Sequence, residues 1–392
     1  PRRRSMTNTM EAATPGGGAT FTTVDELREG RSRIERLRDI EPDDLLGRDP
    51  VELDEAGIGD ILAGKAVLIT GAGGSIGSEL CRQVARYKPA RLVLFELSEF
   101  NLYSIEQELS EAFPALPLVR LVGDVKDLDA LQRTFDAWRP QVVFHAAAYK
   151  HVPLMENLNA WSALRNNTLG TYHAALAAAR AGVGRFVLIS TDKAVNPTNV
   201  MGASKRAAEM AISLLAGLHP GTRFMAVRFG NVLGSSGSVI PKFKEQIARG
   251  GPVTVTHPDI IRYFMTIPEA ARLVLQAAAI GDTGQVLVLD MGEPVRIVDL
   301  ARDLIRMSGH TPEEIPIVFS GLRPGEKLYE ELLADGDATL ATSIPRLRLA
   351  RLEQREASIE QLLRRIEQTD PPLDDDQVRQ ALARAVPEYR RP

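Results

Sequence analysis

The sequence predicts an α/β protein whose core is a doubly wound parallel sheet, accompanied by a smaller α/β domain. Short continuous apolar runs recur roughly every 20 to 45 residues from residue 65 onward. Strands buried on both faces have this pattern, and the spacing leaves room for the helices that connect parallel strands. A glycine-rich turn separates the first apolar run from the first helical stretch, which is typical of doubly wound proteins. Glycine and proline become frequent after Arg228, and this change predicts the second domain.

Each element of the predicted sheet follows from a run of this kind. The runs that predict strands are Ala66–Thr70, Arg91–Glu96, Leu118–Val122, Gln141–Ala148 and Arg185–Thr191. The stretches predicted to be helices are Ile76–Tyr87, Asn101–Ala112, Asn159–Gly182 and Asn199–Leu218. Alternation of strand and helix is the order that a parallel sheet requires.

Composition and charge narrow the functional class. The 392 residues include 47 basic and 51 acidic side chains, for a formal net charge of −4. Phosphate backbones need a clustered basic excess, so the balance argues against a nucleic-acid partner. The apolar runs fall far short of the roughly 18 residues of a membrane span, and we expect no membrane contact by this portion. A lone cysteine, Cys81, fits a reducing, cytoplasmic setting, and the histidines lack the spacing of metal ligands, so no metal is expected.

The turn Thr70–Gly77 has the residues of a dinucleotide site. Its glycines let backbone amides approach a pyrophosphate at the N-terminus of the first helix. Glu96 ends the next strand about 20 residues later, where a carboxylate accepts the ribose hydroxyls and repels a 2′-phosphate. We therefore expect NAD rather than NADP; the alternatives are a tight turn without ligand and a solvated acid. The residues expected to bind NAD here are Gly71, Gly74, Ser75, Ile76, Gly77 and Glu96.

The end of the third predicted strand contributes to the same site. Asp124 is expected at the edge of the adenine, with Val125 beside it. An ordinary turn carboxylate is the alternative interpretation of Asp124.

Several motifs, in order, resemble those of the extended short-chain dehydrogenase/reductase superfamily. The turn has the spacing Thr-Gly-x-x-Gly-x-x-Gly, and His145–Ala148 resembles the superfamily's cofactor-facing fourth strand. Asn167–Thr171 resembles its helix motif, while Arg228–Val232 and Arg323–Lys327 resemble nucleotide-sugar elements of the extended branch. The likeness extends from Gly64 to Leu333. It implies a Rossmann-like fold that binds NAD, with the cofactor against Ala146, Ala147 and Ala148.

The segment Ser190–Pro197 is the candidate catalytic stretch. It follows the fifth predicted strand at its carboxyl end, where ligands bind in open α/β sheets. The superfamily normally continues with Tyr-x-x-x-Lys, but here Met201 stands at the tyrosine position and Lys205 at the lysine position. Lys205 is expected to bind the nicotinamide ribose. Methionine cannot relay a proton, so another residue must supply the acid/base function.

One subgroup shares this departure. Ser190–Val195, Pro197–Ala203 and Ala147–Leu154 are similar to the large UDP-N-acetylglucosamine 4,6-dehydratases of bacterial polysaccharide and glycoprotein biosynthesis. The resemblance implies a UDP-sugar substrate and NAD that is regenerated in each turnover. Such proteins usually carry an upstream membrane region and a further domain, so we expect a longer, membrane-anchored parent with this portion at the inner face. A UDP-sugar 4-epimerase and a non-catalytic NAD-binding module are the alternatives.

The implied reaction needs an acid and a base next to the sugar. Oxidation of the C4 hydroxyl acidifies the C5 proton, a base removes it, an acid protonates the leaving C6 hydroxyl, and hydride returns to C6. We expect Asp192 to be the acid and Lys193 the base, with Thr191 bonded to the C4 hydroxyl in place of tyrosine. The ordinary pKa of lysine is ~10.4, and the pKa of Lys193 must be lower for it to act as a base. The pKa of Asp192 must be raised for it to act as an acid. A loop ion pair is the alternative.

Substrate residues are expected in three regions. Two residues follow the fourth predicted strand, where the resemblance implies a place over the sugar. An asparagine in the Arg228–Val232 motif suits a phosphate or the sugar amide, and three cations in Gly/Pro-rich segments suit a diphosphate. Each of them alone is also explained as a loop or surface group. The residues expected at the substrate are Lys150, His151, Asn231, Arg262, Arg323 and Lys327.

The chain divides into four predicted parts. Residues 1–62 are expected to form a partly disordered arm or linker, with a short helix over Asp25–Ile40. Residues 63–232 are predicted to be the NAD-binding Rossmann domain, residues 233–350 the nucleotide-sugar-binding domain with some return to the sheet, and residues 351–392 a helical tail. The chain begins with Pro1, and we expect a portion of a longer protein. We also expect a homo-oligomer, with Asn159–Gly182 and Asn199–Leu218 as the candidate pairing helices.

Overall fold

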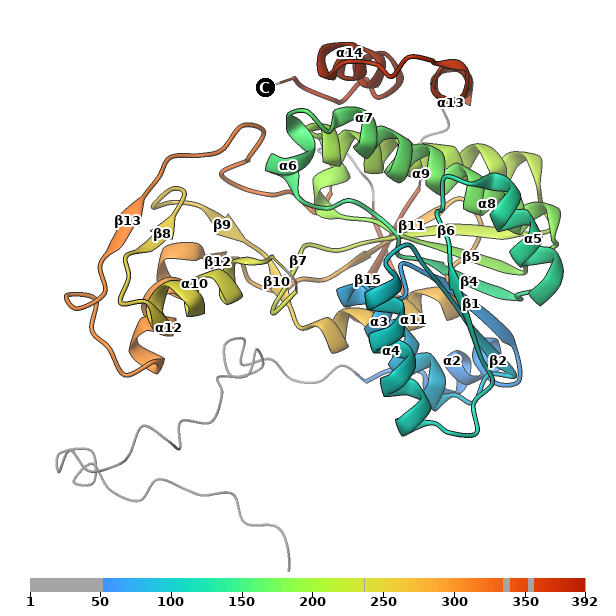
Figure 1. The fold of residues 1–392 in the computed structure, drawn as a ribbon, viewed down its shortest axis with the longest axis horizontal. Coiled ribbons are helices and arrows are strands. Elements are labelled where there is room, and N and C mark those ends of the chain that lie inside the picture. The colour runs from blue at the N-terminus through green and yellow to red at the C-terminus, as the bar shows by residue number, and fades with distance from the viewer. Residues whose placement is uncertain (1–51, 236, 334–338, 352–355, 392) are drawn as a thin grey trace, which may run out of the picture. The chain divides into compact units, whose positions relative to one another are not determined.

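The computed structural model describes residues 52–235, 237–333, 339–351 and 356–391, and within these ranges it contains one nine-stranded sheet (Figure 1). The strand order is β14-β15-β11-β6-β5-β4-β1-β2-β3. The bounds are β1 Ala66–Thr70, β2 Arg91–Glu96, β3 Leu118–Val122, β4 Val142–His145, β5 Arg185–Ile189, β6 Arg223–Arg228, β11 Gln285–Leu289, β14 Leu340–Ala341 and β15 Leu347–Arg351. The expected helix over Asp25–Ile40 lies outside the described residues.

The sheet has the topology that the sequence predicts. The seven strands from β3 to β11 are parallel. At one edge of the described sheet, β15 runs antiparallel to β11, and β14 runs antiparallel to β15. The order β3-β2-β1-β4-β5-β6 is that of a doubly wound dinucleotide-binding fold, so the predicted fold class is confirmed. The order reverses between β1 and β4, and ligands of such sheets bind beside this reversal, at the carboxyl ends of the strands.

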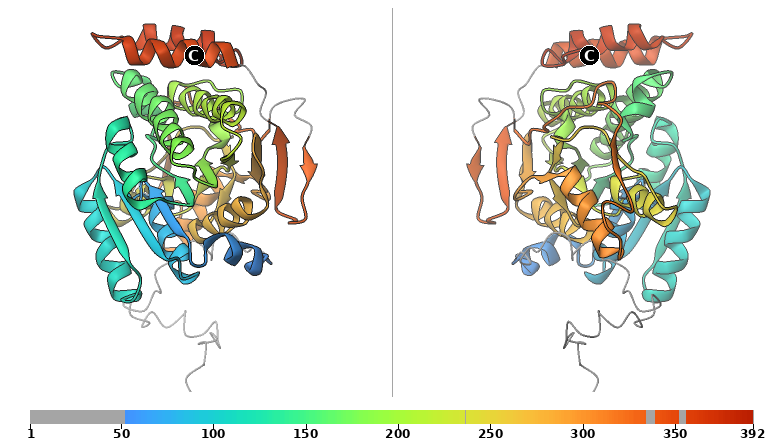
Figure 2. Two further views of the ribbon diagram at one scale, coloured as in Figure 1. Left: turned by 90° about the vertical axis from the view of Figure 1, so that its right-hand side faces the viewer. Right: turned by 90° about the vertical axis from the view of Figure 1, so that its left-hand side faces the viewer.

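Helices cover both faces of the sheet (Figure 2). One face is covered by α2 Glu55–Leu62, α3 Ser75–Arg86, α4 Glu99–Ala112 and α11 Ile267–Ile280. The other face is covered by α5 Leu128–Trp138, α8 Gly170–Arg180 and α9 Val200–Leu218. Alternate side chains of β1 enter the two cores, Val67 and Ile69 on the first face and Leu68 on the second. The strands are therefore buried on both faces, which explains their continuous apolar runs.

Some predicted elements differ from the observed ones at their ends. The fourth and fifth strands stop at His145 and Ile189, earlier than predicted, because the chain leaves the sheet there to form loops at its carboxyl edge. The helix predicted over Asn159–Gly182 consists of α7 Ala160–Ala163, a π-helical segment η3 Leu164–Leu169, and α8. Strands β6 and β11 were not among the predicted strands. The run of β6 keeps the spacing of the repeat but was missed, whereas β11 follows only after the Gly/Pro-rich region.

The second part of the chain is built from short elements. These are β7 Asn231–Val232, α10 Val239–Ala248, β8 Val253–Val255, β9 Ile261–Arg262, β10 Phe264–Met265, β12 Val295–Arg296, α12 Ile297–Met307 and β13 Ile317–Phe319. They pair as β7 with β10, β8 with β13 and β9 with β12. Between and after them the chain returns to the first domain as α11, β11, β14 and β15. The second part is thus interrupted by elements of the sheet domain, and it borders the carboxyl edge of the sheet (Figure 1).

The C-terminal helices lie on α9. Both α13 Glu356–Gln368 and α14 Asp375–Ala385 pack against it, together with α6 Val152–Glu156 and α7. Ile359, Leu362 and Leu382 are buried in this cluster. Every residue of α9 from Val200 to Leu215 is buried as a result. The chain's own tail covers α9, because the apolar face of the tail helices needs a partner. The expected homo-oligomer, with α9 as one of its candidate pairing helices, stays a prediction.

The segment before β1 also packs on the sheet domain. Ile58 and Leu62 of α2 are fully buried next to α11, although the sequence interpretation assigned these residues to the arm. Asp54 caps this helix by accepting a hydrogen bond from the Gly57 amide at 2.9 Å. None of the helices in the described ranges combines the length and the apolar character that crossing a membrane requires.

Candidate active site

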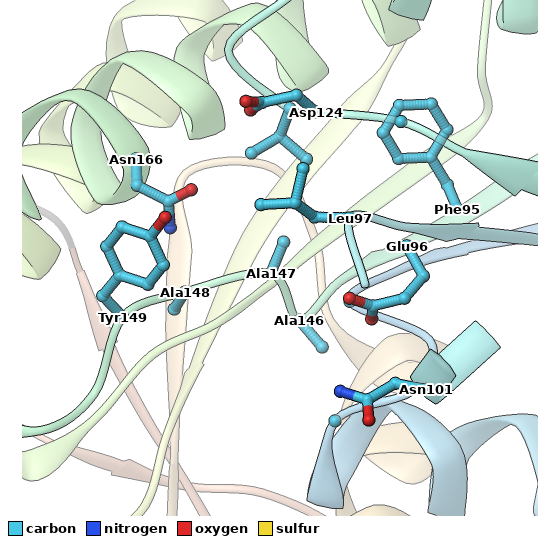
Figure 3. A pocket seen from close by; sticks show the side chains of 14 residues that line it. Phe95, Glu96, Leu97, Asn101, Asp124, Ala146, Ala147, Ala148, Tyr149 and Asn166 are labelled. Carbon is cyan, nitrogen blue, oxygen red and sulfur yellow. The ribbon is translucent and has the colours of Figure 1, made fainter. Parts of the chain in front are cut away.

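A cavity of about 230 Å³ opens at the carboxyl ends of β1, β2 and β4 (Figure 3). It lies at the reversal of strand order, where the topology predicts a ligand. Tyr149 and Asn166 lie at one end of the view in Figure 3, and Glu96 and Asn101 at the other. The residues that line the cavity are Gly71, Gly74, Phe95, Glu96, Leu97, Asn101, Gly123, Asp124, Val125, Ala146, Ala147, Ala148, Tyr149 and Asn166.

The glycine turn forms one wall of this cavity. Gly71 has a φ of +63°, and a Cβ at this position would lie 2.7 Å from the Ala147 amide nitrogen, so only glycine fits. The Gly71 amide donates to the Phe95 carbonyl at 2.9 Å, which ties the turn to β2. Helix α3 begins directly after Gly74, with no side chain capping its N-terminus. A helix N-terminus next to a close backbone approach is a site for a pyrophosphate.

Glu96 is held in position at the end of β2. Its Oε2 accepts a hydrogen bond from the Gly73 amide at 2.9 Å, and its Oε1 accepts one from the Ser98 amide at 3.0 Å. The residue is 8% exposed. Each carboxylate oxygen has a further lone pair, so the group can still accept hydrogen bonds from two ribose hydroxyls. A phosphate at the 2′ position would meet a fixed negative charge here.

Asp124 lies after β3 with Val125, and both line the cavity. Asp124 accepts a hydrogen bond from the Lys126 amide at 2.9 Å and forms an ion pair with Lys126 Nζ at 2.8 Å. Burial acts to raise the pKa of Asp124, but the contacts with Lys126 outweigh it and hold the pKa below its usual value. Its carboxylate is therefore charged where it lines the cavity.

The structure divides the predicted cofactor residues into two groups. Eight of them line the cavity: Gly71, Gly74, Glu96, Asp124, Val125, Ala146, Ala147 and Ala148. Ser75, Ile76 and Gly77 belong to the first turn of α3, next to the cavity but not lining it. Lys205 is buried in α9, where its Nζ donates to the Ile189 carbonyl at 2.7 Å. Burial lowers the pKa of Lys205 to about 8.

The candidate catalytic residues form a tight turn after β5. Thr191 precedes a 3-10 helix, η4 Asp192–Ala194, and its Oγ1 accepts a hydrogen bond from the Lys193 amide at 3.3 Å. The same hydroxyl donates to Asp192 Oδ1 at 2.9 Å. Asp192 is fully buried, and its Oδ2 has no hydrogen-bond partner among the described residues. A buried carboxylate oxygen without a partner is costly, which favours a functional interpretation of this turn.

Lys193 lies between two carboxylates. Its Nζ donates to Asp192 Oδ1 at 2.9 Å and to Asn231 Oδ1 at 3.1 Å, and it is 3.9 Å from Glu330 Oε1. Burial acts to lower the pKa of Lys193, but Asp192 and Glu330 outweigh it, and the pKa lies above the ordinary lysine value. The direction is opposite to the one expected for a base, because the sequence did not reveal the second carboxylate.

A buried cluster of charged residues around Glu209 lies next to the catalytic turn. Glu209 of α9 accepts hydrogen bonds from Arg228 at 2.7 and 2.8 Å and from the Ser190 hydroxyl at 2.6 Å. Arg206 adds a third partner at 3.2 Å. Burial acts to raise the pKa of Glu209, but these partners outweigh it and lower the pKa to about 2. Glu209 thereby joins the ends of β5 and β6, which carry the catalytic turn and Asn231.

The Arg323–Lys327 motif lies against the segment that follows the catalytic turn. Thr198 Oγ1 and Asn199 Nδ2 both donate to the Gly325 carbonyl at 3.1 Å. Lys327 Nζ donates to the Val195 carbonyl at 3.1 Å. Two motifs that are more than a hundred residues apart in sequence are therefore in contact in the folded chain.

Arg262 holds this motif in place. Its guanidinium donates to the carbonyl oxygens of Ile261 at 2.7 Å, Lys327 at 2.8 Å and Leu328 at 3.3 Å. Arg262 is 7% exposed. Arg262 thus binds backbone carbonyls on two segments of the chain, and its expected contact with a diphosphate stays a prediction.

The other predicted substrate residues are more peripheral. Lys150 and His151 are exposed at the start of α6, and a Cβ at Gly237 would come within 2.5 Å of the His151 ring. Arg323 is exposed and pairs with Glu326 at 3.0 Å. Met201, at the tyrosine position, is 2% exposed and packs in the cluster beneath the C-terminal helices.

Two residues of the site were missed by the sequence interpretation. Glu330 follows the Arg323–Lys327 motif and reaches Lys193, and Glu209 lies four residues after Lys205 on α9. Adjacency to a motif was the only signal for Glu330. Glu209 lies close in sequence to the cations Lys205 and Arg206 on a helix whose other residues are mostly apolar or small, and such a cluster of charges indicates a buried ion pair.

Comparisons with known proteins agree with this geometry. A family model described as "Polysaccharide biosynthesis protein" matches residues 67–351. The capsular polysaccharide biosynthesis protein CapD of Staphylococcus aureus is 56% identical over 311 residues, which are 79% of this chain and 52% of that protein. A UDP-N-acetylglucosamine 4,6-dehydratase (inverting) of Campylobacter jejuni is 32% identical over 284 residues, 70% of this chain and 79% of that protein.

The solved structures include a similar chain. The X-ray structure of Pen from Bacillus thuringiensis superposes with a TM-score of 0.69 at 30% identity, covering 82% of this chain and 98% of that one. The chain spans about half the length of the first curated relatives that it matches. These similarities confirm the family that the sequence motifs indicated.

Proposed function

Because the chain belongs to the polysaccharide biosynthesis protein family, we propose that it is an NAD-dependent 4,6-dehydratase of UDP-N-acetylglucosamine. The observation that carries the proposal is the Thr191-Asp192-Lys193 turn at the carboxyl end of β5. It offers a hydroxyl, a carboxylate and an ammonium in contact with one another, where the superfamily normally has a tyrosine. A C4 epimerase needs that tyrosine, whereas elimination of water needs a separate acid and base.

The residues around the cavity fit NAD. Glu96 would accept the hydroxyls of the adenine-side ribose, and the N-terminus of α3 with Gly71 and Gly74 would hold the pyrophosphate. NAD supplies a hydride acceptor for C4 and, once reduced, a hydride donor for C6. Lys205, whose ammonium donates to the Ile189 carbonyl, would bind the second ribose with its remaining hydrogens.

Thr191 and Asp192 are proposed to move the proton of the C4 hydroxyl. Thr191 Oγ1 would accept the proton of the sugar hydroxyl while it passes its own to Asp192 Oδ1, along the 2.9 Å hydrogen bond already present. Asp192 would hold this proton until the C6 hydroxyl leaves as water. Because Asp192 is fully buried, the proton on Oδ1 stays out of contact with bulk solvent.

Lys193 is proposed to take the C5 proton after C4 has become a ketone. Asn231 and Asp192 hold its Nζ at fixed positions through bonds of 3.1 and 2.9 Å. The same nitrogen would return a proton to C5 when C6 is reduced. For the diphosphate, we propose Arg323 and Lys327, which lie on the loop that contacts the catalytic segment.

Proton NMR in heavy water tests the function. The purified chain is incubated with UDP-N-acetylglucosamine, first without and then with added NAD, and the sugar signals are followed. We expect a C6 methyl signal, with deuterium at C5. Formation of the galacto isomer with C6 unchanged would make the protein an epimerase, and an unchanged substrate after addition of NAD would overturn the proposed reaction.

A further inference from the structure

Glu330 is a buried carboxylate next to the proposed base. The residue is 8% exposed, and its Oε1 lies 3.9 Å from Lys193 Nζ and 3.9 Å from Arg262. Its Oε2 is buried and makes no hydrogen bond within the part of the chain that the structure describes. A carboxylate that is buried this deeply normally has its oxygens fully paired, so the position needs an explanation beyond packing.

The loop that carries Glu330 also carries the proposed diphosphate cations. Lys327 is three residues before Glu330, and its Nζ donates to Val195, two residues after Lys193. Arg262 binds the carbonyl oxygens of Lys327 and Leu328, so this stretch is fixed from both sides. A diphosphate bound by Arg323 and Lys327 would contact the same short segment of the chain that carries Glu330. Binding of the nucleotide and the position of the carboxylate are therefore mechanically linked.

Burial and the charges around Lys193 favour the transfer of a proton from Lys193 to Glu330. Burial raises the pKa of Glu330, and the charge of Asp192 adds to this effect, although Lys193, Arg262 and Lys327 oppose it. A sugar that covers Lys193 would remove the remaining water from the pair. Excluding water destabilises an ion pair relative to the neutral amine and carboxylic acid, because desolvation penalises both charges.

We propose that Glu330 is the proton acceptor for Lys193, taking one ammonium proton when the substrate closes the site and leaving a neutral amine to remove the C5 proton. In this step an N–H bond of Lys193 breaks and an O–H bond forms on Glu330 Oε1. The lone pair released on nitrogen then takes the C5 proton, and both transfers reverse when C5 is protonated again. The two atoms must approach by about 1 Å to reach hydrogen-bond distance. Glu330 does not contact the sugar in this step. It acts through Lys193, whose protonation state it sets, and is therefore a positioning residue.

This inference rests on the proposed function and explains one of its difficulties. Lys193 is held as an ammonium by two carboxylates in the described structure, and an ammonium cannot act as a base. Asp192 is already engaged in the transfer of the C4 and C6 protons. Glu330 is the second carboxylate within 4 Å of Lys193 among the described residues, so it supplies the acceptor that the reaction lacks.

The pH dependence of kcat in Glu330→Gln distinguishes a proton acceptor from an electrostatic neighbour. We expect kcat at pH 7 to fall at least about 10-fold with KM nearly unchanged, and to recover at high pH, where solvent removes the lysine proton. The ascending limb of the profile therefore moves to higher pH. Unchanged kcat at pH 7, or a limb moved to lower pH, would overturn the proposal, since a neighbour that merely stabilised the ammonium would have that effect.

Two further variants complete this experiment. Glu330→Asp keeps the charge but shortens the side chain, and we expect an intermediate kcat with the ascending limb of the wild type. Glu313→Gln removes an exposed carboxylate from the same part of the chain and should match the wild type. If Glu330→Asp behaves like Glu330→Gln at every pH, the carboxylate is not the acceptor.

A titration without substrate separates this inference from the proposed function. The chain has nine lysines, so ¹³C-labelled lysine side chains can be followed by NMR, with Lys193 assigned from Lys193→Arg. We expect Glu330→Gln to lower the pKa of Lys193 and Glu313→Gln to leave it unchanged. An identical Lys193 titration in all three chains would overturn the inference. Failure of the wild type to dehydrate the sugar would instead overturn the proposed function, whatever the titration.

Discussion

Asn199 and Gly325 are 126 residues apart in the chain and are joined by a hydrogen bond of 3.1 Å from the Asn199 side chain to the Gly325 carbonyl. Asn199 caps α9 directly after the catalytic turn by accepting a hydrogen bond from the Gly202 amide at 2.8 Å. Gly325 belongs to the loop with the proposed diphosphate cations. The contact therefore couples the proposed chemistry to the proposed binding of the nucleotide.

Gly325→Ala should disrupt this contact. Gly325 has a φ of +74°, and a Cβ there would lie 2.7 Å from the Asn199 Cβ, so the loop must move away from α9. We expect KM for the UDP-sugar to rise by about 10-fold, equivalent to ~1.4 kcal/mol. Gly321→Ala is the matched control, because Gly321 has a φ of +84° but open space around its Cβ position. Equal KM values in the two variants would argue against the coupling.

Asp192→Asn and Lys193→Ala should each reduce turnover by at least about 100-fold, because each removes one proton-transfer group. Turnover is followed by the appearance of the C6 methyl signal. Lys193→Ala should in addition abolish deuterium incorporation at C5. Lys242→Ala, which removes an exposed lysine of α10, serves as the control. Retention of wild-type turnover in both site variants would eliminate the assigned acid and base.

Glu96→Gln should weaken the preference for NAD over NADP. The neutral amide no longer repels a 2′-phosphate, and we expect the ratio of the two dissociation constants to fall by at least about 10-fold. Isothermal titration calorimetry with each dinucleotide measures the ratio directly. Glu99→Gln, at an exposed position three residues later, should keep the wild-type ratio. An unchanged ratio in Glu96→Gln would assign the selectivity to other residues.

The ion cluster of Glu209 should make stability depend on acid pH. The pKa of Glu209 is about 2 in the folded chain against an ordinary 4.5, so its contribution to stability is complete above about pH 4.5 and is lost as the pH falls toward 2. Urea unfolding between pH 3 and 7 measures this slope. Glu209→Gln leaves Arg228 without its carboxylate, while Arg206 keeps Glu388, and we expect a loss of roughly 3–5 kcal/mol at pH 7. A loss under 1 kcal/mol would contradict the structural role.

The C-terminal helices should be part of the folded core. Leu382 of α14 is fully buried in the cluster over α9, so Leu382→Ala should lower the free energy of unfolding by about 2–5 kcal/mol. Leu340→Ala, at a position that is 60% exposed, should change it little. Chemical denaturation of the two variants gives the comparison. Equal stabilities would show that the tail does not unfold together with the sheet domain.

The fold class and eight of the residues that line the cavity could be predicted from the sequence. The first three strands were predicted with their observed bounds, because buried parallel strands have short, continuous apolar runs. Glu96 was predicted in the cavity from its place at the end of β2. Strand β11 was not predicted, since it joins the sheet only after the chain has passed through the second domain.

The sequence by itself determined the features that depend on neighbouring residues. These are the strands with their apolar runs, the glycine turn, and the acids at the ends of strands. The tertiary structure decided how distant segments meet. It brought Glu330 within 3.9 Å of Lys193, raised the pKa of the proposed base, directed Arg262 to backbone carbonyls, and covered α9 with the C-terminal helices. Electrostatic energies depend on distance and burial in space rather than on separation along the chain, so the protonation state of the site could be read only from the folded arrangement.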